Sequence, residues 1–306
     1  MVNARPDSPA SLPTFGLICG VLAYTMWGFF PVYFKATDTV SALEILAHRV
    51  VWSLPFGLII LVLRKQIRET LSAFRDWSRV KWLLVASLTM ALNWGLYIWA
   101  IQVDRIFEAS LGYYINPLLY VLAGVVLYSE RLGRLQIVAI GLAVIGVSVL
   151  TIAGGTFPWI SLVLATSFTI YGVIRKRVEI GAMPGLFIEV AVIWLPAVAY
   201  LLWLGTQGSL VFLSGSPSLD ALLLFAGPLT VLPLLCFAIA ARRLQLSTLG
   251  FLQFIGPTLQ FACGLYYGED FTRAHAICFG FIWTAVAVFV FANIRAVGHD
   301  RKAAFS

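Results

Sequence analysis

The sequence is poor in charged residues, which make up 11% of its 306 positions. Soluble domains contain about 25% of such residues on average. Hydrophobic residues reach 60%, and the mean hydropathy of +0.92 is too high for a chain that covers its surface with polar groups. Although the length alone allows two soluble domains, this composition predicts a polytopic membrane protein.

Cysteine and histidine are also scarce, with four of the first and three of the second. Each cysteine lies inside an apolar run and none forms a CxxC pair, which argues against disulfides and metal clusters. No HExxH, GxSxG or Walker A pattern occurs, so neither an enzyme nor direct ATP coupling is indicated. The first residues carry no basic n-region, so we expect no cleaved signal peptide. No cofactor or metal is expected.

Long apolar runs are abundant, and a helix needs about 20 such residues to cross the hydrocarbon core. Six charge-free segments reach that length, a seventh of 40 residues is long enough for two spans, and two more carry charge near one end. These runs predict ten helices, at 15–34, 41–63, 82–103, 109–129, 135–174 in two parts divided at 154–158, 183–204, 221–241, 244–268 and 274–294. Since no segment alternates at period two as barrel strands do, the predicted fold class is all-α.

The basic residues sort to one side of the predicted membrane. If the N-terminus is cytoplasmic, the outer loops hold only Lys35, Arg105 and Arg273, and Arg49 lies within a span. The other seventeen of the 21 are cytoplasmic: Arg5, Arg64, Lys65, Arg68, Arg75, Arg79, Lys81, Arg131, Arg134, Arg175, Lys176, Arg177, Arg242, Arg243, Arg295, Arg301 and Lys302. The net charge of +7 therefore reflects topology and indicates no nucleic-acid partner.

The two halves of the sequence resemble each other. One helical stripe recurs 140 positions later, as Tyr113, Pro117, Tyr120 and Gly124 and then Gln253, Pro257, Gln260 and Gly264. Both helices end near an acid, Glu130 and Glu269. Five helices per half is an odd number, so the second copy is inverted in the membrane. This predicts two repeats, 1–152 and 153–306, each with a short cytoplasmic tail, and the alternating access typical of secondary transporters.

Local strings are more specific. Residues 44–53 (EILAHRVVWS) resemble the helix-two signature of the RarD family, in the EamA branch of the drug/metabolite transporter superfamily. Further matching strings are 108–117 (EASLGYYINP), 171–176 (YGVIRK), 233–237 (PLLCF), 246–251 (LSTLGF) and 253–259 (QFIGPTL). The resemblance implies ten helices in two inverted EamA repeats, cytoplasmic termini, and a bacterial inner-membrane exporter or permease. It also implies that the fifth and tenth helices pack outside the cavity, as a dimer or lipid face.

The same resemblance brings a chloramphenicol-resistance label, although relatives in the superfamily export amino acids and other metabolites. It leaves the substrate open.

Arg49, Glu189, Glu44 and His48 lie inside predicted spans, where ionisable residues are costly unless they are paired or functional. Arg49, about eight residues into its span, either binds a substrate carboxylate, nitro or carbonyl group in a cavity or snorkels to the outer interface. Glu189 either exchanges a proton with substrate or pairs at the interface with the basic cluster 175–177. Glu44 and His48, four residues apart, either bond each other or form a proton relay.

Uncharged polar and aromatic residues are the other candidates for the cavity. Trp27 and Tyr171, at similar places in the first and sixth spans, suit stacking on a planar substrate. Pro117 and Pro257 each remove a helical hydrogen bond and predict a kink whose free carbonyl needs a partner. The remaining candidates are Asn93, Trp94, Tyr97, Tyr113, Asn116, Tyr120, Gln253 and Gln260. For all of them the alternative is structural, as core filling or packing between helices.

The expected function is secondary transport of a small metabolite or drug-like molecule across the bacterial inner membrane. The alternatives are a non-transporting membrane scaffold or chaperone, and an amino-acid facilitator without ion coupling. The expected partners are a small-molecule substrate, the lipid bilayer and, in the coupled case, a proton. The chain is expected to work as a monomer or a homodimer.

Overall fold

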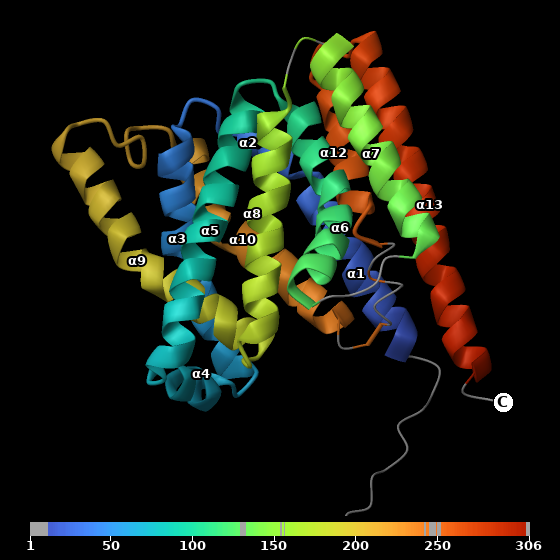
Figure 1. Cartoon of the computed structure of the whole chain (residues 1–306). Coiled ribbons are helices and arrows are strands. Elements are labelled where there is room, and N and C mark those ends of the chain that lie inside the picture. Colours follow the sequence, from blue (N-terminus) through green and yellow to red (C-terminus); the bar gives the residue numbers. More distant parts are fainter. Residues whose placement is uncertain are drawn as a thin grey trace, which may run out of the picture.

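The computed structural model describes residues 12–128, 133–153, 155, 157–241, 243–244, 249 and 252–303. Within these residues the regular elements are helices, shown in Figure 1: α1 Leu12–Gly28, α2 Phe30–Ala36, α3 Ala42–Leu63, α4 Ile67–Phe74, α5 Trp77–Gln102, α6 Ile106–Tyr128, α7 Arg134–Ala153, α8 Trp159–Arg177, α9 Ala182–Thr206, α10 Pro217–Ala241, α12 Ile255–Tyr266 and α13 Arg273–Ala303. The all-helical prediction is confirmed for this part of the chain. Some predicted features lie outside the described residues: Arg5, Glu130, Arg131, Arg242, most of 245–251, and positions 154 and 156 of the expected break.

Eight helical stretches of the described chain are long and apolar enough to cross a membrane. They are Thr14–Ala36, Ala42–Leu63, Trp77–Gln102, Ile106–Leu127, Arg134–Ala153, Ala182–Thr206, Pro217–Ala240 and Arg273–Ala292. The other two predicted spans coincide with shorter helices, α8 with 19 residues and α12 with 12. The structure thus supports a multi-pass membrane protein.

The first predicted span is broken where a single helix was expected. It divides at Phe29 into α1 and α2, and Pro31 lies in the first turn of α2. Because proline has no N–H, the carbonyl of Trp27, four residues earlier, has no helical donor. The Gln260 Nε2 atom of α12 donates to that oxygen at 3.2 Å. The break in the first span therefore becomes an attachment point for a helix from the other half of the chain.

The two prolines predicted to kink helices differ in their effect. Pro117 lies inside α6, as expected. Pro257, however, is the third residue of α12, which begins at Ile255. The first-turn N–H groups of a helix have no intrahelical partner in any case, so a proline there breaks no bond. The expected kink at Pro257 is thus a helix start.

The helices pack as a central group with a pair at its edge. α7 and α13 lie side by side along one edge of the molecule in Figure 1 and pack mainly against each other. A Cβ atom at Gly146 of α7 would lie 3.0 Å from the carbonyl oxygen of Cys278 of α13, so this glycine permits the close approach. In the central group, α1 packs against α10 and α12, α6 against α8 and α12, α3 against α9 and α10, and α5 against α8 and α9.

One short helix was not predicted. α4 lies in the basic connection 64–81 and crosses the end of the bundle, where it packs against α9 and α5 (Figure 1). The Glu69 side chain of α4 accepts a hydrogen bond from Gly181 N at 3.0 Å, immediately before α9 begins. Asp76 accepts from Ser78 N at 3.0 Å and begins α5 as its N-cap.

Candidate functional site

Arg49 lies in the interior between α3, α5, α2 and α10, with 2% of its surface exposed. Its Nε donates to Thr230 Oγ1 of α10 at 3.1 Å. Its guanidinium carbon is 4.5 Å from the ring centre of Trp94, and Phe30 and Phe34 lie at 5.5 and 5.6 Å. Within the described chain Arg49 forms no ion pair with a carboxylate. This burial contradicts the snorkelling alternative and leaves a cation surrounded by aromatic rings.

A polar network continues from this centre toward α8. The Tyr97 ring packs edge-on against Phe34 and Tyr113, and its hydroxyl is buried without a hydrogen-bond partner among the described residues. The Tyr113 hydroxyl donates to Asn93 Oδ1 at 3.4 Å. Asn93 Nδ2 donates in turn to Ser167 Oγ at 2.8 Å and to the Leu164 carbonyl at 2.9 Å. Of the predicted residues, Trp94 contacts Arg49 directly, and Tyr97, Tyr113 and Asn93 form a series of contacts that leads from the Phe34 ring to α8.

Glu189 forms a second buried centre, 4% exposed, between α9 and α8. The Tyr171 hydroxyl donates to its Oε2 at 3.1 Å, and Arg175 Nε lies 3.4 Å from its Oε1. The Arg175 guanidinium packs on Gly185 of α9, where any Cβ atom would collide with it. The predicted pairing with the 175–177 cluster is thus present for Arg175, although the carboxylate is buried and not interfacial. Two predicted residues, Tyr171 and Glu189, are in direct contact here.

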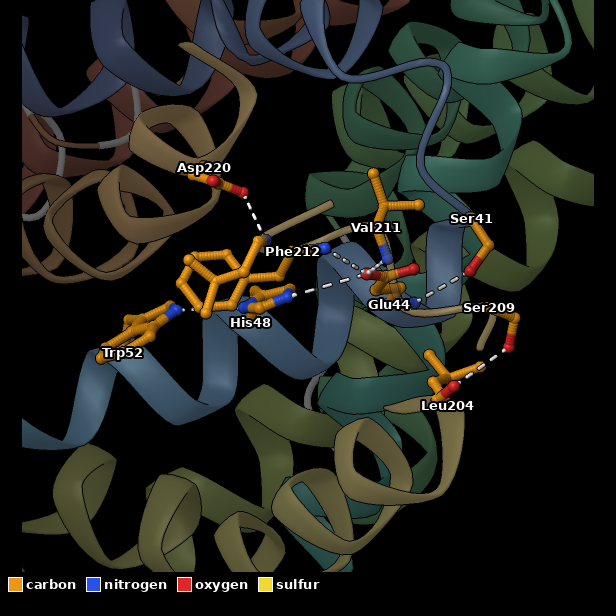
Figure 2. Close-up of polar contacts among 10 residues, drawn as sticks. Ser41, Glu44, His48, Trp52, Leu204, Ser209, Val211, Phe212 and Asp220 are labelled. Carbon is orange, nitrogen blue, oxygen red and sulfur yellow. Dashed lines mark hydrogen bonds and ion pairs between the residues drawn. The ribbon is translucent and has the colours of Figure 1, made fainter. Parts of the chain in front are cut away.

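Glu44 and His48 form a third group, near the loop between α9 and α10 (Figure 2). Glu44 Oε1 accepts from Val211 N at 2.9 Å and Phe212 N at 3.4 Å. His48 Nε2 is 3.9 Å from the same oxygen, which is beyond hydrogen-bond distance. His48 Nδ1 instead accepts from Trp52 Nε1 at 3.0 Å. The two side chains are therefore in the expected i,i+4 contact, at ion-pair distance but too far apart for a hydrogen bond, and Glu44 also holds the loop backbone.

Most of the remaining candidates contact neighbouring helices. Asn116 Oδ1 of α6 accepts from Thr169 Oγ1 of α8 at 3.0 Å, and Tyr120 OH donates to the Phe168 carbonyl at 3.2 Å. Trp27 packs against the Tyr24 and Phe237 rings. Gln253 lies in a turn before α12. Among the described residues, none of these side chains forms a hydrogen bond or a cation–π contact with Arg49, so the structure divides the predicted set among several places.

Glu269 is tied to the start of α6, although it follows α12 in the chain. Its carboxylate accepts from Ile106 N at 2.6 Å and Phe107 N at 3.1 Å. The pKa of Glu269 is raised to about 7, mainly by burial and to a smaller extent by the nearby Glu108 and Asp104, while the two N–H donors act in the opposite direction. This acid therefore joins the two halves of the chain at one end of the bundle.

Comparison with known proteins identifies the family. Residues 14–152 match the model of the EamA-like transporter family. An uncharacterized transporter of Vibrio cholerae is 45% identical over 94% of this chain and 96% of its own length. Protein RarD of Streptomyces exfoliatus is 42% identical over 94% of this chain and 91% of its own length. The chain belongs to the RarD group of the EamA-like transporter family.

A solved structure supports the same fold for this EamA-like transporter. A crystal structure of a protein 18% identical in sequence superposes with a TM-score of 0.60 and covers 91% of this chain and 98% of its own. At that identity the likeness concerns the fold alone. Family membership makes the chain a multi-pass membrane transporter.

Sequence reasoning missed several residues of the EamA-like transporter's interior. Thr230, Ser167 and Thr169 are polar residues inside apolar runs, which was the available signal. The signal is weak, because each hydroxyl also donates to the carbonyl four residues before it, as Thr230 does to Ala226 at 2.8 Å. Because each hydroxyl can donate its hydrogen bond within its own helix, the sequence gives no sign of a partner on another helix.

Proposed function

We propose that this protein is a secondary transporter of the bacterial inner membrane, which exports or exchanges a small amphipathic or planar molecule by alternating access. In this proposal ten helices form two inverted repeats, 1–152 and 153–306, and both termini are cytoplasmic. α1, α5, α6, α8, α10 and α12 surround the substrate pathway. α7 and α13 lie outside it.

The helix packing supports the inverted repeat. Three major contacts between the halves have a counterpart when the halves are exchanged: α6 with α8 and α12 with α1, α5 with α8 and α10 with α1, and α3 with α10 and α9 with α5. At the residue level, Tyr120 donates to the carbonyl of Phe168, and Gln260 donates to that of Trp27. The donors are 140 positions apart and the acceptors 141, so a similar bond occurs in each of two helix pairs that the proposed repeat makes equivalent.

The observation that carries the substrate proposal is the buried Arg49 without an acidic partner in the described chain. A cation in a low-dielectric interior is costly unless an anion or strong acceptor compensates it. Thr230 supplies one neutral acceptor, and the Trp94, Phe30 and Phe34 rings supply quadrupole attraction. We therefore assign Arg49 as the ligand of a substrate carboxylate, nitro or carbonyl oxygen, with the rings packing against the rest of the molecule.

Proton coupling is assigned to Glu189 in the coupled form of this proposal. Its carboxylate is buried and bound to a phenol and a guanidinium. Protonation would release the guanidinium of Arg175 and so weaken the contact of α8 with α9. If transport is uncoupled, the same pair is structural.

Counterflow in proteoliposomes tests the proposal. Proteoliposomes that contain the purified protein are loaded with unlabelled chloramphenicol or members of an amino-acid panel. Uptake of the labelled compound is then measured with and without an imposed pH gradient. We expect uptake by the wild type, and uptake that rises with the gradient if Glu189 couples it. We expect its loss in Arg49→Ala at unchanged membrane abundance. Absence of counterflow for the whole panel by correctly inserted protein contradicts the proposed substrate class and favours a scaffold.

A matched control separates a ligand role from a general effect of charge. Arg177, an exposed residue at the end of α8, is changed to alanine in parallel. We expect Arg177→Ala to transport normally. If Arg49→Ala does so as well, Arg49 does not bind the substrate.

A further inference from the structure

α4 presents three different faces around its axis, at the 100° turn per residue of an α-helix. Thr70 and Ala73 are buried against the bundle. Glu69, next to them on the helix, is bound to Gly181 N. This side of α4 is therefore accounted for by contacts within the protein.

The second face is apolar and uncovered. Ile67, Leu71 and Phe74, spaced i, i+4 and i+7, are 37%, 55% and 40% exposed. Leu63 at the end of α3 and Trp77 at the start of α5 are 76% and 70% exposed on either side of it. An exposed apolar surface of this kind is typical of a site that contacts a membrane or another protein.

The third face is basic. Arg68 and Arg75 are exposed beside the apolar stripe and, with Ile67, Leu71 and Ser72, line a shallow, open hollow along this side of the helix. The acids of this connection are already engaged, Glu69 by Gly181 and Asp76 by Ser78 and Arg79. The exposed charge beside the stripe is therefore positive and has no acid from this connection to neutralise it.

We propose that α4 is a docking surface for anionic phospholipids of the membrane to which the protein belongs. An apolar stripe flanked by basic residues is the pattern of a helix that lies in the plane of a membrane interface, and basic clusters next to a span attract anionic headgroups. Ile67, Leu71 and Phe74 enter the acyl boundary, and the hollow beside Arg68 and Arg75 takes a phosphate. An acidic protein partner would match the charge but not the position of the stripe between the exposed ends of two membrane spans.

Hydrogen–deuterium exchange in nanodiscs tests this surface. The full-length protein is placed in phosphatidylcholine alone or in a mixture with phosphatidylglycerol, and exchange of the α4 amides is followed. We expect slower exchange in the anionic mixture and a smaller difference at high salt. Equal exchange of these amides in the two lipids would overturn the proposal.

Two variants and a soluble probe sharpen the test. R68Q/R75Q should lose most of the anionic protection, because two basic side chains near an anionic surface contribute roughly 30-fold in affinity. R177Q, which changes an exposed arginine outside α4, should keep it. Both changes are at exposed positions and leave the fold intact. The proposal is overturned if R68Q/R75Q keeps the slower exchange in the anionic mixture. It is also overturned if soluble glycerol phosphate produces the same slowing in phosphatidylcholine, because α4 would then not bind the anionic bilayer itself. The readout is independent of transport, so its failure leaves the proposed function standing.

Discussion

Arg49 and Glu189 lie 140 positions apart, in α3 and α9, and both are almost fully buried. Their surroundings differ. Glu189 has a charged partner, Arg175, and a phenol donor, whereas Arg49 has a neutral hydroxyl and three aromatic rings. A buried charge with an opposite charge beside it needs no further partner. A buried charge without one destabilises the fold unless another group, such as a bound ligand, compensates it. In the proposed inverted repeat these two positions are equivalent, and the comparison favours Arg49 as the proposed ligand of the substrate.

The largest expected effect separates function from stability at Arg49. Arg49→Gln should lower transport by about 30-fold or more, as loss of a buried charged contact costs 2–5 kcal/mol. It should leave the melting temperature unchanged or raise it, because an uncompensated buried cation destabilises the fold. Counterflow and thermal unfolding of the same preparations check this. A large fall in melting temperature would show that Arg49 is a structural residue.

Glu189→Gln, unlike Arg49→Gln, should lower the stability of the protein. Removal of the carboxylate leaves the Arg175 guanidinium without its partner, so we expect a loss of stability of about 1–3 kcal/mol, less than for a fully enclosed pair because Arg175 is partly exposed. Arg175→Gln in the same chain should restore part of it, as expected for coupled residues. Thermal unfolding of the two single variants and the double variant measures the coupling. Additive losses would mean that the ion pair does not contribute.

A smaller effect concerns Glu269 and pH. Its pKa in the folded protein is raised from the usual 4.5 to about 7, so the folded state binds the proton more tightly than the unfolded state. The stability that this group contributes is therefore complete below pH 4.5 and is lost as the pH rises through about 7. Glu269→Gln keeps an oxygen that accepts from Ile106 N and Phe107 N, and should remove this part of the pH dependence.

Melting temperatures across this pH range check the prediction. Glu179→Gln, at an exposed position before α9, is the matched control and should keep the wild-type profile. If Glu269→Gln and the wild type show the same profile, another group causes the pH dependence.

Much of the fold was predictable because hydropathy acts locally. The spans at 41–63 and 183–204 agree with α3 and α9 to within a few residues, and the charges inside them, Arg49 and Glu189, marked the two centres. What was not predictable depends on contacts between distant segments. Thr230 lies 181 positions from Arg49, and Val211, which binds Glu44, lies 167 positions from it.

Local breaks in the helices were harder to predict for a different reason. The division at Phe29 and the helix start before Pro257 both involve prolines. A proline is compatible with a kink, a break or a first turn. Which of them forms depends on whether a neighbouring helix satisfies the freed carbonyl, and the sequence of one segment does not contain that information.

The smallest effect tests the equivalence of the two halves at one pair of bonds. Tyr120→Phe and Gln260→Leu each remove one hydrogen bond to a carbonyl of a neighbouring helix, worth about 0.6 kcal/mol on average in membranes and at most about 1.7. Phe168 lies inside α8 four residues before Gly172, so its carbonyl keeps a helical donor when Tyr120 is changed.

The carbonyl of Trp27 has no such donor, because the residue four positions later is Pro31. We therefore expect Gln260→Leu to lower the free energy of unfolding by the larger amount and Tyr120→Phe by the smaller, measured by thermal unfolding. Equal losses would mean that the proline break in the first span is satisfied in another way. The two hydrogen bonds would then contribute equally to stability. A larger loss for Gln260→Leu would show that its bond also stabilises the broken first span.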